Sequence, residues 1–100
     1  MQPEFTAIQQ TIYPVLQKHG IKRANLFGSF ADGTATEQSD VDLLVELSVS
    51  IGLLQFIRIK HDLEDVLQRK VDLVEFRAIK PSLQKLILKQ SIPIYGQETA

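Results

Sequence analysis

Apolar residues recur at helical spacing near the start of the chain. Residues 4–19 carry apolar positions at Phe5, Ile8, Ile12, Val15 and Leu16. This spacing predicts an amphipathic helix, and Gly20 is typical of a residue that follows the last helical turn. Pro14 lies inside the pattern and has no backbone N–H. We therefore expect it to kink or split the helix between residues 10 and 13.

Short apolar segments later in the chain have the character of β-strands. They span residues 23–27, 41–47, 71–76 and 92–95. The last of them contains Pro93, which cannot donate to a strand ladder, so we expect it to be an edge strand at best.

Two further segments return to helical spacing. Residues 53–68 place one apolar stripe on a single face, formed by Leu53, Phe56, Ile57, Leu63, Val66 and Leu67. We expect this stripe to face the core and not a partner. Pro81 precedes a shorter helix over residues 82–90. The order α-β-β-α-β-α-β predicts one α+β domain over residues 1–100, a small mixed sheet with helices packed mainly on one face.

The composition is that of one small folded domain. The 100 residues are 44% apolar and 23% charged, unlike a disordered chain. The formal net charge of −1 lacks the basic excess of a protein that binds nucleic acid directly. No apolar run approaches the about 18 residues of a membrane span. The start, Met1–Glu4, does not resemble a secretory signal, and the absence of cysteine favours the cytoplasm.

The candidate chemistry begins with a pair of carboxylates at fixed distance from a turn. Ten residues separate Gly28-Ser29 from Asp40-Val41-Asp42. Residues two apart in a strand point to the same face, so the carboxylates of Asp40 and Asp42 should converge. Mg²⁺ prefers oxygen ligands and usually takes one or two carboxylates together with phosphate oxygens. The spacing therefore predicts a site for Mg²⁺ and a nucleoside triphosphate.

Asp72 would bring a third carboxylate to the same place if its strand neighbours residues 41–47. Carboxylates 4 Å apart repel by about 1 kcal/mol per pair even in water, so a fold that gathers three of them needs a cation. We expect Asp40, Asp42 and Asp72 to hold one or two Mg²⁺ ions. Such ions clamp the attacking and leaving oxygens of an in-line phosphoryl displacement, with Asp72 activating the acceptor hydroxyl.

Gly28 and Ser29 form the other half of the candidate site. Glycine has no Cβ, so the backbone at Gly28 can turn tightly and approach phosphate oxygens closely. Ser29 offers a hydroxyl and a backbone N–H, and the residues after it can open a short helix. Each piece alone has a plainer interpretation, since Ser39-Asp40 can simply start a turn and Asp72 can be a solvated strand end. Their combination at this spacing favours the functional interpretation.

Three segments carry a family resemblance, and they are Leu26-Phe27-Gly28-Ser29, Ser39-Asp40-Val41-Asp42-Leu43 and Val71-Asp72-Leu73. They resemble the signature of the DNA polymerase beta-like nucleotidyltransferase superfamily, and the short chain resembles its minimal nucleotidyltransferase (MNT) branch. The resemblance implies transfer of a nucleoside monophosphate, here AMP from ATP, to a hydroxyl. It also implies a helical HEPN protein as partner. Several such pairs are toxin–antitoxin systems in which the MNT member adenylylates a tyrosine of the HEPN ribonuclease.

Asp32 departs from the family pattern, which usually has Arg at this position. An inverted charge beside a triphosphate loses about 2 kcal/mol at 4 Å in water, although Lys60 or a basic residue of a partner could compensate. The alternative hypothesis is therefore a catalytically weak or inactive module that neutralises its partner by binding alone. The intact carboxylates favour the enzyme. A chain this short cannot enclose a nucleotide, so we expect the open side of the cleft to meet another protein, in a hetero- or homo-oligomer. An antibiotic-type small-molecule acceptor is disfavoured.

Overall fold

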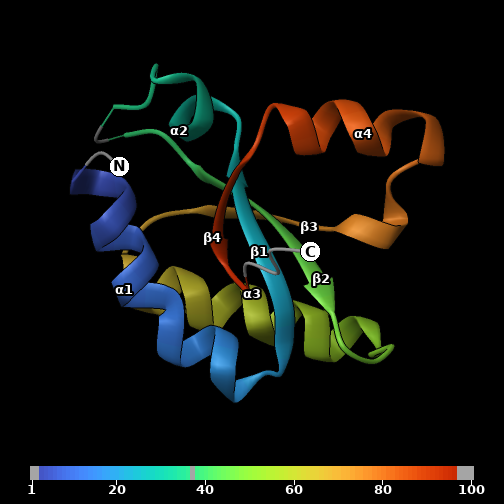
Figure 1. Cartoon of the computed structure of the whole chain (residues 1–100). Helices are drawn as coiled ribbons and strands as arrows, with labels where there is room; N and C mark the ends of the chain where they lie inside the picture. The colour runs from blue at the N-terminus through green and yellow to red at the C-terminus, as the bar shows by residue number, and fades with distance from the viewer. Residues whose placement is uncertain (1–2, 37, 97–100) are drawn as a thin grey trace.

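The computed structural model describes residues 3–36 and 38–96 (Figure 1). The elements in chain order are α1 (Pro3–Lys18), β1 (Ile21–Phe27), α2 (Ser29–Asp32), β2 (Val41–Leu47), α3 (Leu53–Leu67), β3 (Val71–Glu75), the 3₁₀ turn η1 (Phe76–Ala78), α4 (Pro81–Lys89) and β4 (Ile92–Tyr95). The assignment of residues 1–100 to a single domain stays a prediction, because its two ends and residue 37 lie outside the described residues. No helix in the described part of the chain is long and apolar enough to cross a membrane.

The strands of the described residues form one four-stranded mixed sheet in the order β3-β2-β1-β4. β1 runs antiparallel to both β2 and β4, whereas β2 and β3 are parallel and are joined through α3, as a parallel crossover requires. β4 is an edge strand, as Pro93 predicted. Because β2 and β3 are parallel, residues near their starts lie at the same end of the sheet.

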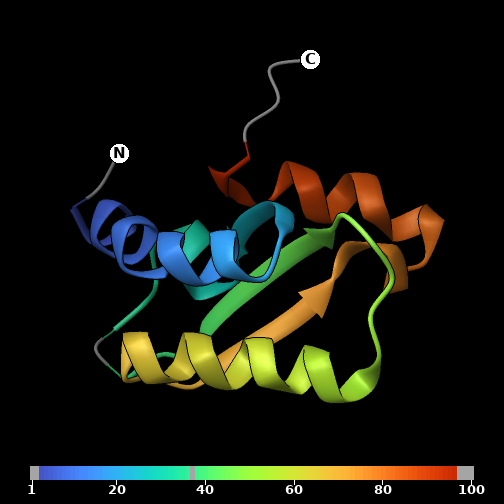
Figure 2. The same ribbon diagram turned by 90° about the horizontal axis from the view of Figure 1, so that it is seen from below.

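The two long helices cover one face of the sheet, and α4 lies on the other. In Figure 2, β2 and β3 run between α3 and α4. The core lies between the sheet, α1 and α3, and its most deeply buried side chains are Ile12, Leu16, Leu26, Val41, Leu43, Val45, Ile59, Leu63 and Ile94. Burying one such side chain contributes about 1.5–3 kcal/mol. The predicted α+β class, with a mixed sheet and the main helices on one face, is confirmed.

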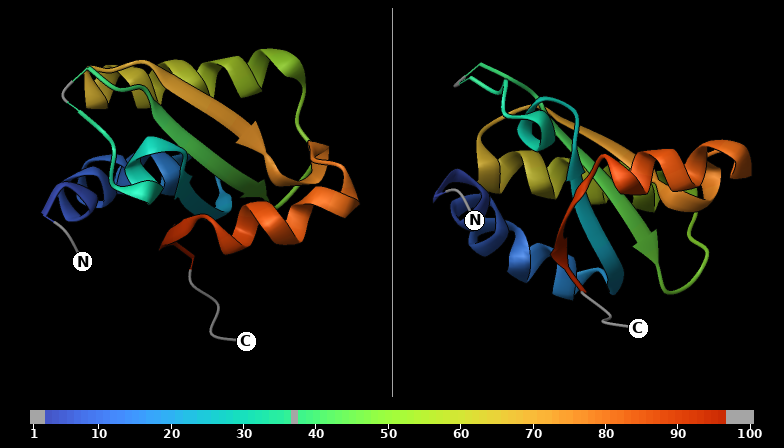
Figure 3. Two further views of the ribbon diagram at one scale, coloured as in Figure 1. Left: turned by 90° about the horizontal axis from the view of Figure 1, so that it is seen from above. Right: turned by 45° about the horizontal axis from the view of Figure 1, so that its top comes forward.

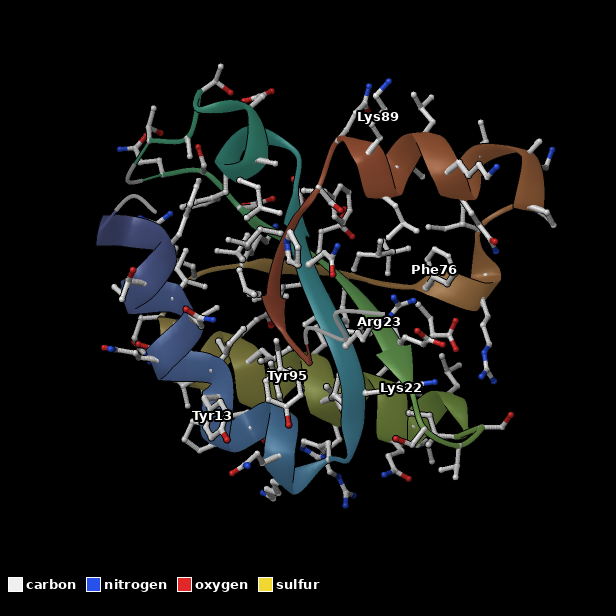
Figure 4. The ribbon with its side chains drawn as sticks, in the orientation of Figure 1. Tyr13, Lys22, Arg23, Phe76, Lys89 and Tyr95 are labelled. Carbon is white, nitrogen blue, oxygen red and sulfur yellow. The ribbon has the colours of Figure 1, made fainter. Side chains whose placement is uncertain are left out.

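Arg23 organises the outer face of the sheet beneath η1 and α4. Its Nε and Nη2 lie 2.7 and 2.6 Å from Oε1 of Glu46 on the neighbouring strand. The guanidinium also lies over the ring of Phe76, 5.9 Å from its centroid (Figure 4). The Arg23–Glu46 ion pair and the contact of Arg23 with Phe76 therefore cover the face of the sheet next to η1.

The predicted break of α1 at Pro14 is wrong, because the helix runs unbroken from Pro3 to Lys18. Pro14 and Gln10 are both exposed. The Gln10 carbonyl, which would accept the missing N–H of residue 14, can therefore accept a hydrogen bond from water instead. Ile12 and Leu16 hold the opposite side of the helix in the core.

The apolar stripe of α3 is only partly buried, so its predicted orientation is partly wrong. Of the predicted stripe, Leu63 is buried, and Phe56 and Leu67 pack partly against the core. Ile59, which the predicted stripe did not include, is buried as well. Leu53, Ile57 and Val66 are exposed, with Leu53 at 73%. The buried residues follow the spacing i, i+3, i+7, i+11, which is one narrow helical face. The sequence pattern is wider than the surface that α1 and the sheet cover.

A side-chain pair joins the end of α1 to α3. Nε2 of His19 lies 2.7 Å from Oδ2 of Asp62, and Nζ of Lys18 lies 3.6 Å from the same oxygen. The His19 side chain is 7% exposed. The hydrogen bond with His19, with a smaller effect of the Lys18 charge, holds the pKa of Asp62 below its ordinary value, although burial opposes this.

This pair predicts a pH-dependent contribution to stability. A carboxyl group whose pKa is lowered by folding stabilises the native state above its unfolded pKa, near about 4, and the effect is lost as the pH falls through the folded pKa. We expect Asp62→Asn to unfold at a lower temperature than wild type at pH 7, with the difference shrinking below about pH 4. Thermal unfolding followed by circular dichroism measures both chains, with Asp65→Asn on the exposed side of α3 as control. A difference that stays constant from neutral to acidic pH would contradict the assignment.

Candidate active site

The strand register brings the candidate carboxylates together. Asp42 on β2 pairs directly with Asp72 on the parallel strand β3. Asp40 lies one residue before β2. On the other side of β2, Phe27 pairs with Asp42, so the chain turns at Gly28 beside the same carboxylate. The predicted convergence of the two sequence motifs therefore follows from the sheet itself.

The alternation of side chains along β2 sets which way the site faces. Val41 and Leu43 are buried in the core beneath α1 and α3, so Asp42 between them points to the opposite face. Asp42 is half-buried there, whereas Asp40 and Asp72 are exposed. The carboxylates are thus open to solvent and to a ligand on the face of the sheet where α4 lies.

The carboxylates share one electrostatic environment. Burial is the main cause that raises the pKa of Asp42 above its ordinary value, and the negative charges of Asp72 and Asp40 raise it further. Within residues 3–36 and 38–96, no group of three or more His, Cys, Asp or Glu side chains is already arranged around a metal position. The donor chemistry nevertheless fits Mg²⁺, which commonly takes one or two carboxylates and completes its shell with phosphate oxygens and water.

Two features require glycine at position 28, namely its backbone conformation and the closeness of the Asp42 carboxylate. Its φ of 69° and ψ of −142° lie in a region that side chains rarely adopt. A Cβ at this position would lie 2.0 Å from Oδ2 of Asp42. The Gly28 carbonyl also accepts the N–H groups of Ala31 and Asp32, at 3.0 and 3.1 Å. The turn is therefore held against the carboxylate with no room for a side chain.

Ser29 begins α2, a helix of four residues, which confirms the expected short helix after the turn. Its carbonyl accepts the N–H groups of Thr34 and Ala35, at 3.0 and 3.1 Å. Phe30 is 4% exposed and belongs to the core. The buried ring anchors α2, and with it the position of Gly28 and Ser29 at the edge of the site.

A cleft of about 500 Å³ opens beside this turn, and its lining residues are Gly28, Ala31, Asp32, Lys89, Gln90, Ser91 and Ile92. This volume is within the range of small-molecule sites. One wall is α2, and the other is the turn from α4 into β4, where Figure 4 labels Lys89. Asn25 Nδ2 donates to Oγ of Ser91 at 2.9 Å and fixes that turn to β1.

The α4–β4 wall is the part of the site that the sequence did not predict. Residues 89–92 reach the Gly28 turn because β4 pairs antiparallel with β1, with Leu26 opposite Ile92. No local motif marks residues 89–92, since their position depends on which strand β4 pairs with. The pairing of an edge strand is not encoded in periodicity.

The family described as polymerase beta, nucleotidyltransferase matches residues 10–100 of the chain. The chain belongs to this family. It is 41% identical over 87 residues to MJ0435 of Methanocaldococcus jannaschii, assigned as a protein adenylyltransferase, which covers 87% of this chain and 94% of the relative. It is 36% identical over 76 residues to the protein adenylyltransferase MntA of Thermococcus cleftensis, covering 76% of this chain and 77% of the relative. The expected nucleotidyltransferase is confirmed.

Solved structures share the fold of this nucleotidyltransferase. One assigned as a minimal nucleotidyltransferase is 37% identical with a TM-score of 0.77, covering 90% of this chain and 92% of the other. A toxin–antitoxin complex with AMP-PNP gives a TM-score of 0.78 at 24% identity, covering 90% and 74%. An MNT antitoxin in complex with a tri-AMPylated HEPN toxin of Shewanella oneidensis gives 0.72 at 20% identity, covering 93% and 73%. The expected MNT branch is confirmed.

In this nucleotidyltransferase, Asp32 stabilises its own turn. Its Oδ1 accepts the N–H of Thr34 at 3.0 Å and the Thr34 hydroxyl at 2.6 Å, and these hydrogen bonds lower the pKa of Asp32. Lys60 belongs to α3, which lies on the opposite side of the sheet from α4 (Figure 3), and it is not among the residues that line the cleft. Lys89 is the basic residue that lines the cleft.

Proposed function

We propose that the chain is a Mg²⁺-dependent adenylyltransferase that transfers AMP from ATP to a tyrosine hydroxyl of a HEPN-type toxin and so acts as the antitoxin. The observation that carries the proposal is the direct pairing of Asp42 with Asp72 beside the Gly28 turn. Relatives named protein adenylyltransferases support the reaction. Structural neighbours with AMP-PNP and with an AMPylated HEPN toxin support the nucleotide and the partner.

The proposed step is an in-line displacement at the α-phosphorus of ATP. The tyrosine oxygen forms a bond to that phosphorus, the bond to the bridging oxygen of the β-phosphate breaks, and pyrophosphate leaves. Asp72 accepts the hydroxyl proton. Asp40, Asp42 and Asp72 would hold Mg²⁺, which supplies neutralisation of the phosphate charge when bound. The Gly28 backbone allows close approach of the phosphates, and Ser29 donates to their oxygens.

The open cleft is consistent with a protein acceptor. Asp40 and Asp72 are exposed at this end of the sheet, next to a cleft whose two walls are α2 and the turn from α4 into β4. A partner that inserts a tyrosine there would complete the walls around the nucleotide. The cytoplasm fits this reaction, since ATP and Mg²⁺ are abundant there and the sequence contains no cysteine.

The test is transfer of label from α-³²P-ATP to the HEPN-type protein in the presence of Mg²⁺. We expect label on the partner, a mass increase of one AMP group per modified site, and loss of both when the modified tyrosine is changed to phenylalanine. Neutralisation of the toxin without ATP, and without any label on the toxin, would instead support the alternative of inhibition by binding alone. Asp32 is the observation that favours this alternative.

Charge at position 32 should control ATP affinity. Asp32 lines the cleft, so Asp32→Arg replaces a repulsion by an attraction that can bind phosphate in bidentate fashion. We expect about three- to thirtyfold tighter binding of ATP–Mg²⁺, less than the Coulomb limit because an exposed charge is screened. Calorimetric titration at fixed ionic strength measures it.

The matched controls for this prediction separate charge from turn stability. Asp32→Asn keeps an oxygen that accepts the Thr34 hydrogen bonds and removes only the charge, so it should give a smaller gain. Lys89→Gln should weaken binding. Unchanged affinity in Asp32→Arg and Asp32→Asn would mean that position 32 does not act on the triphosphate.

A further inference from the structure

Arg69 connects the two halves of the site from the turn between α3 and β3. Its Nη1 donates to the carbonyl of Ser39 at 3.1 Å and to the carbonyl of Thr36 at 3.3 Å. Its guanidinium lies over the Phe30 ring, 5.3 Å from the centroid. One side chain therefore contacts the loop that leads into Asp40 and the helix that follows Gly28-Ser29.

Arg69 reaches this loop from behind the site. It is half-buried and lines a hollow of about 220 Å³ with residues of α1, α2 and α3, which are Ala7, Ile8, Thr11, Phe30, Val66 and Leu67. The cleft beside the Gly28 turn is lined by a different set of residues. The charge of Arg69 is thus directed to backbone carbonyls and to a buried ring and not to the cleft.

The loop before Asp40 has few other connections to the fold. Thr36 and Ser39 bond to each other, through the Ser39 N–H to the Thr36 carbonyl at 3.1 Å and the Thr36 N–H to Oγ of Ser39 at 2.8 Å. Among the described residues, the hydrogen bonds that tie residues 36–40 to another element are those from Arg69. The sheet ladder resumes with the Val41 N–H and the Lys70 carbonyl at 2.9 Å.

We propose that Arg69 is a positioning residue of the transfer reaction, which fixes the Asp40 carboxylate relative to Asp42 and to the Gly28-Ser29 turn. The inference rests on the proposed function. A planar guanidinium can donate to two carbonyls and stack on a ring at once, whereas a lysine ammonium cannot do all three. Since a displacement of about 1 Å at a reacting group can cost about a hundredfold in rate, a loose Asp40 would slow transfer even with every carboxylate present.

The kinetic test compares Arg69→Ala and Arg69→Lys with Arg58→Ala, the control on the exposed side of α3. We expect Arg69→Ala to lower kcat for AMP transfer about ten- to a hundredfold and to change KM for ATP far less, because Arg69 does not line the cleft. Arg69→Lys should fall between Arg69→Ala and wild type, and Arg58→Ala should match wild type. A wild-type kcat in a folded Arg69→Ala protein overturns the proposal.

A second measurement is independent of activity. Amide hydrogen exchange followed by NMR should show exchange of the Ser39 N–H about tenfold faster in Arg69→Ala, which corresponds to a loss of about 1.4 kcal/mol of local stability. Exchange in the centre of β1 should stay as in wild type. Unchanged exchange at Ser39 overturns the positioning role, whereas absence of transfer by the wild-type chain overturns the proposed function alone. If Arg69→Ala does not fold, Arg69→Lys is used for both measurements, and it should show a lower kcat and faster exchange of the Ser39 N–H than wild type.

Discussion

Asp42→Asn is expected to abolish AMP transfer while leaving the fold intact. The carboxylate of Asp42 is the member of the site that stands between the other two, paired with Asp72 across the sheet and close to Asp40 in the chain. An amide of the same shape removes the negative charge that a metal ligand needs. We expect a loss of about 10³-fold or more in kcat, since removal of a single group that stabilises transition-state charge already costs about 10²–10³.

The same variant should be at least as stable as wild type. Burial and the charges of Asp72 and Asp40 raise the pKa of Asp42, so the ionised carboxylate opposes folding at neutral pH. Its removal should stabilise the fold by up to about 1 kcal/mol, the repulsion of one carboxylate pair at 4 Å in water. Thermal unfolding in the absence of Mg²⁺ and ATP measures this difference. Full transfer activity in Asp42→Asn would show that the metal assignment is wrong.

Gly28→Val is expected to lose ATP binding. Even the Cβ of Gly28→Ala would lie 2.0 Å from Oδ2 of Asp42, so either the carboxylate or the turn must move. The backbone conformation adds strain of about 1–3 kcal/mol for any side chain. On the proposed function, both effects act on groups that would contact the phosphates. We expect at least a tenfold loss of affinity in Gly28→Ala, about 1.4 kcal/mol, and a larger loss in Gly28→Val.

Gly33→Ala is the matched control for Gly28. Gly33 also has a positive φ, of 83°, and follows α2 directly, but a Cβ there would meet nothing within 4 Å. It should lose stability through backbone strain, by about 1–2 kcal/mol, and keep its affinity for ATP. Titration calorimetry and thermal unfolding separate the two effects. Undiminished ATP affinity in a folded Gly28→Val protein would contradict close approach of the phosphates at this turn.

The sequence was most informative where local chemistry determines structure. Residues 41–47 and 92–95 were predicted as strands and are strands with the same bounds, because their apolar runs end at turn residues and Pro93 allows only an edge. The convergence of Asp42 and Asp72 depended on one assumption, that their strands are neighbours. The parallel register confirms that assumption.

What the sequence did not reveal depends on contacts between distant segments. Arg69 acts on backbone carbonyls, which have no signature in a sequence. Lys89 reaches the cleft only because β4 pairs with β1. Periodicity shows that α3 is apolar on one side, but it does not show how much of that side the sheet covers. The sequence therefore predicts Leu53 and Ile57 in the core, whereas both are exposed. Pro14 does not break α1, because it lies on the solvent side of the helix, where Gln10 is also exposed.

On the proposed function, the parallel pairing of β2 and β3 makes transfer activity depend on a chain that has folded as far as β3. Asp42 and Asp72 are thirty residues apart and meet only after α3 has crossed the sheet and packed. Non-local parallel pairings of this kind are slow to form, because closing the loop between the strands costs entropy. A nascent chain that ends after β2 already contains Gly28, Ser29, Asp40 and Asp42, yet it has no third carboxylate. On the proposed function, such a truncated chain holds an incomplete set of metal ligands and would not transfer AMP.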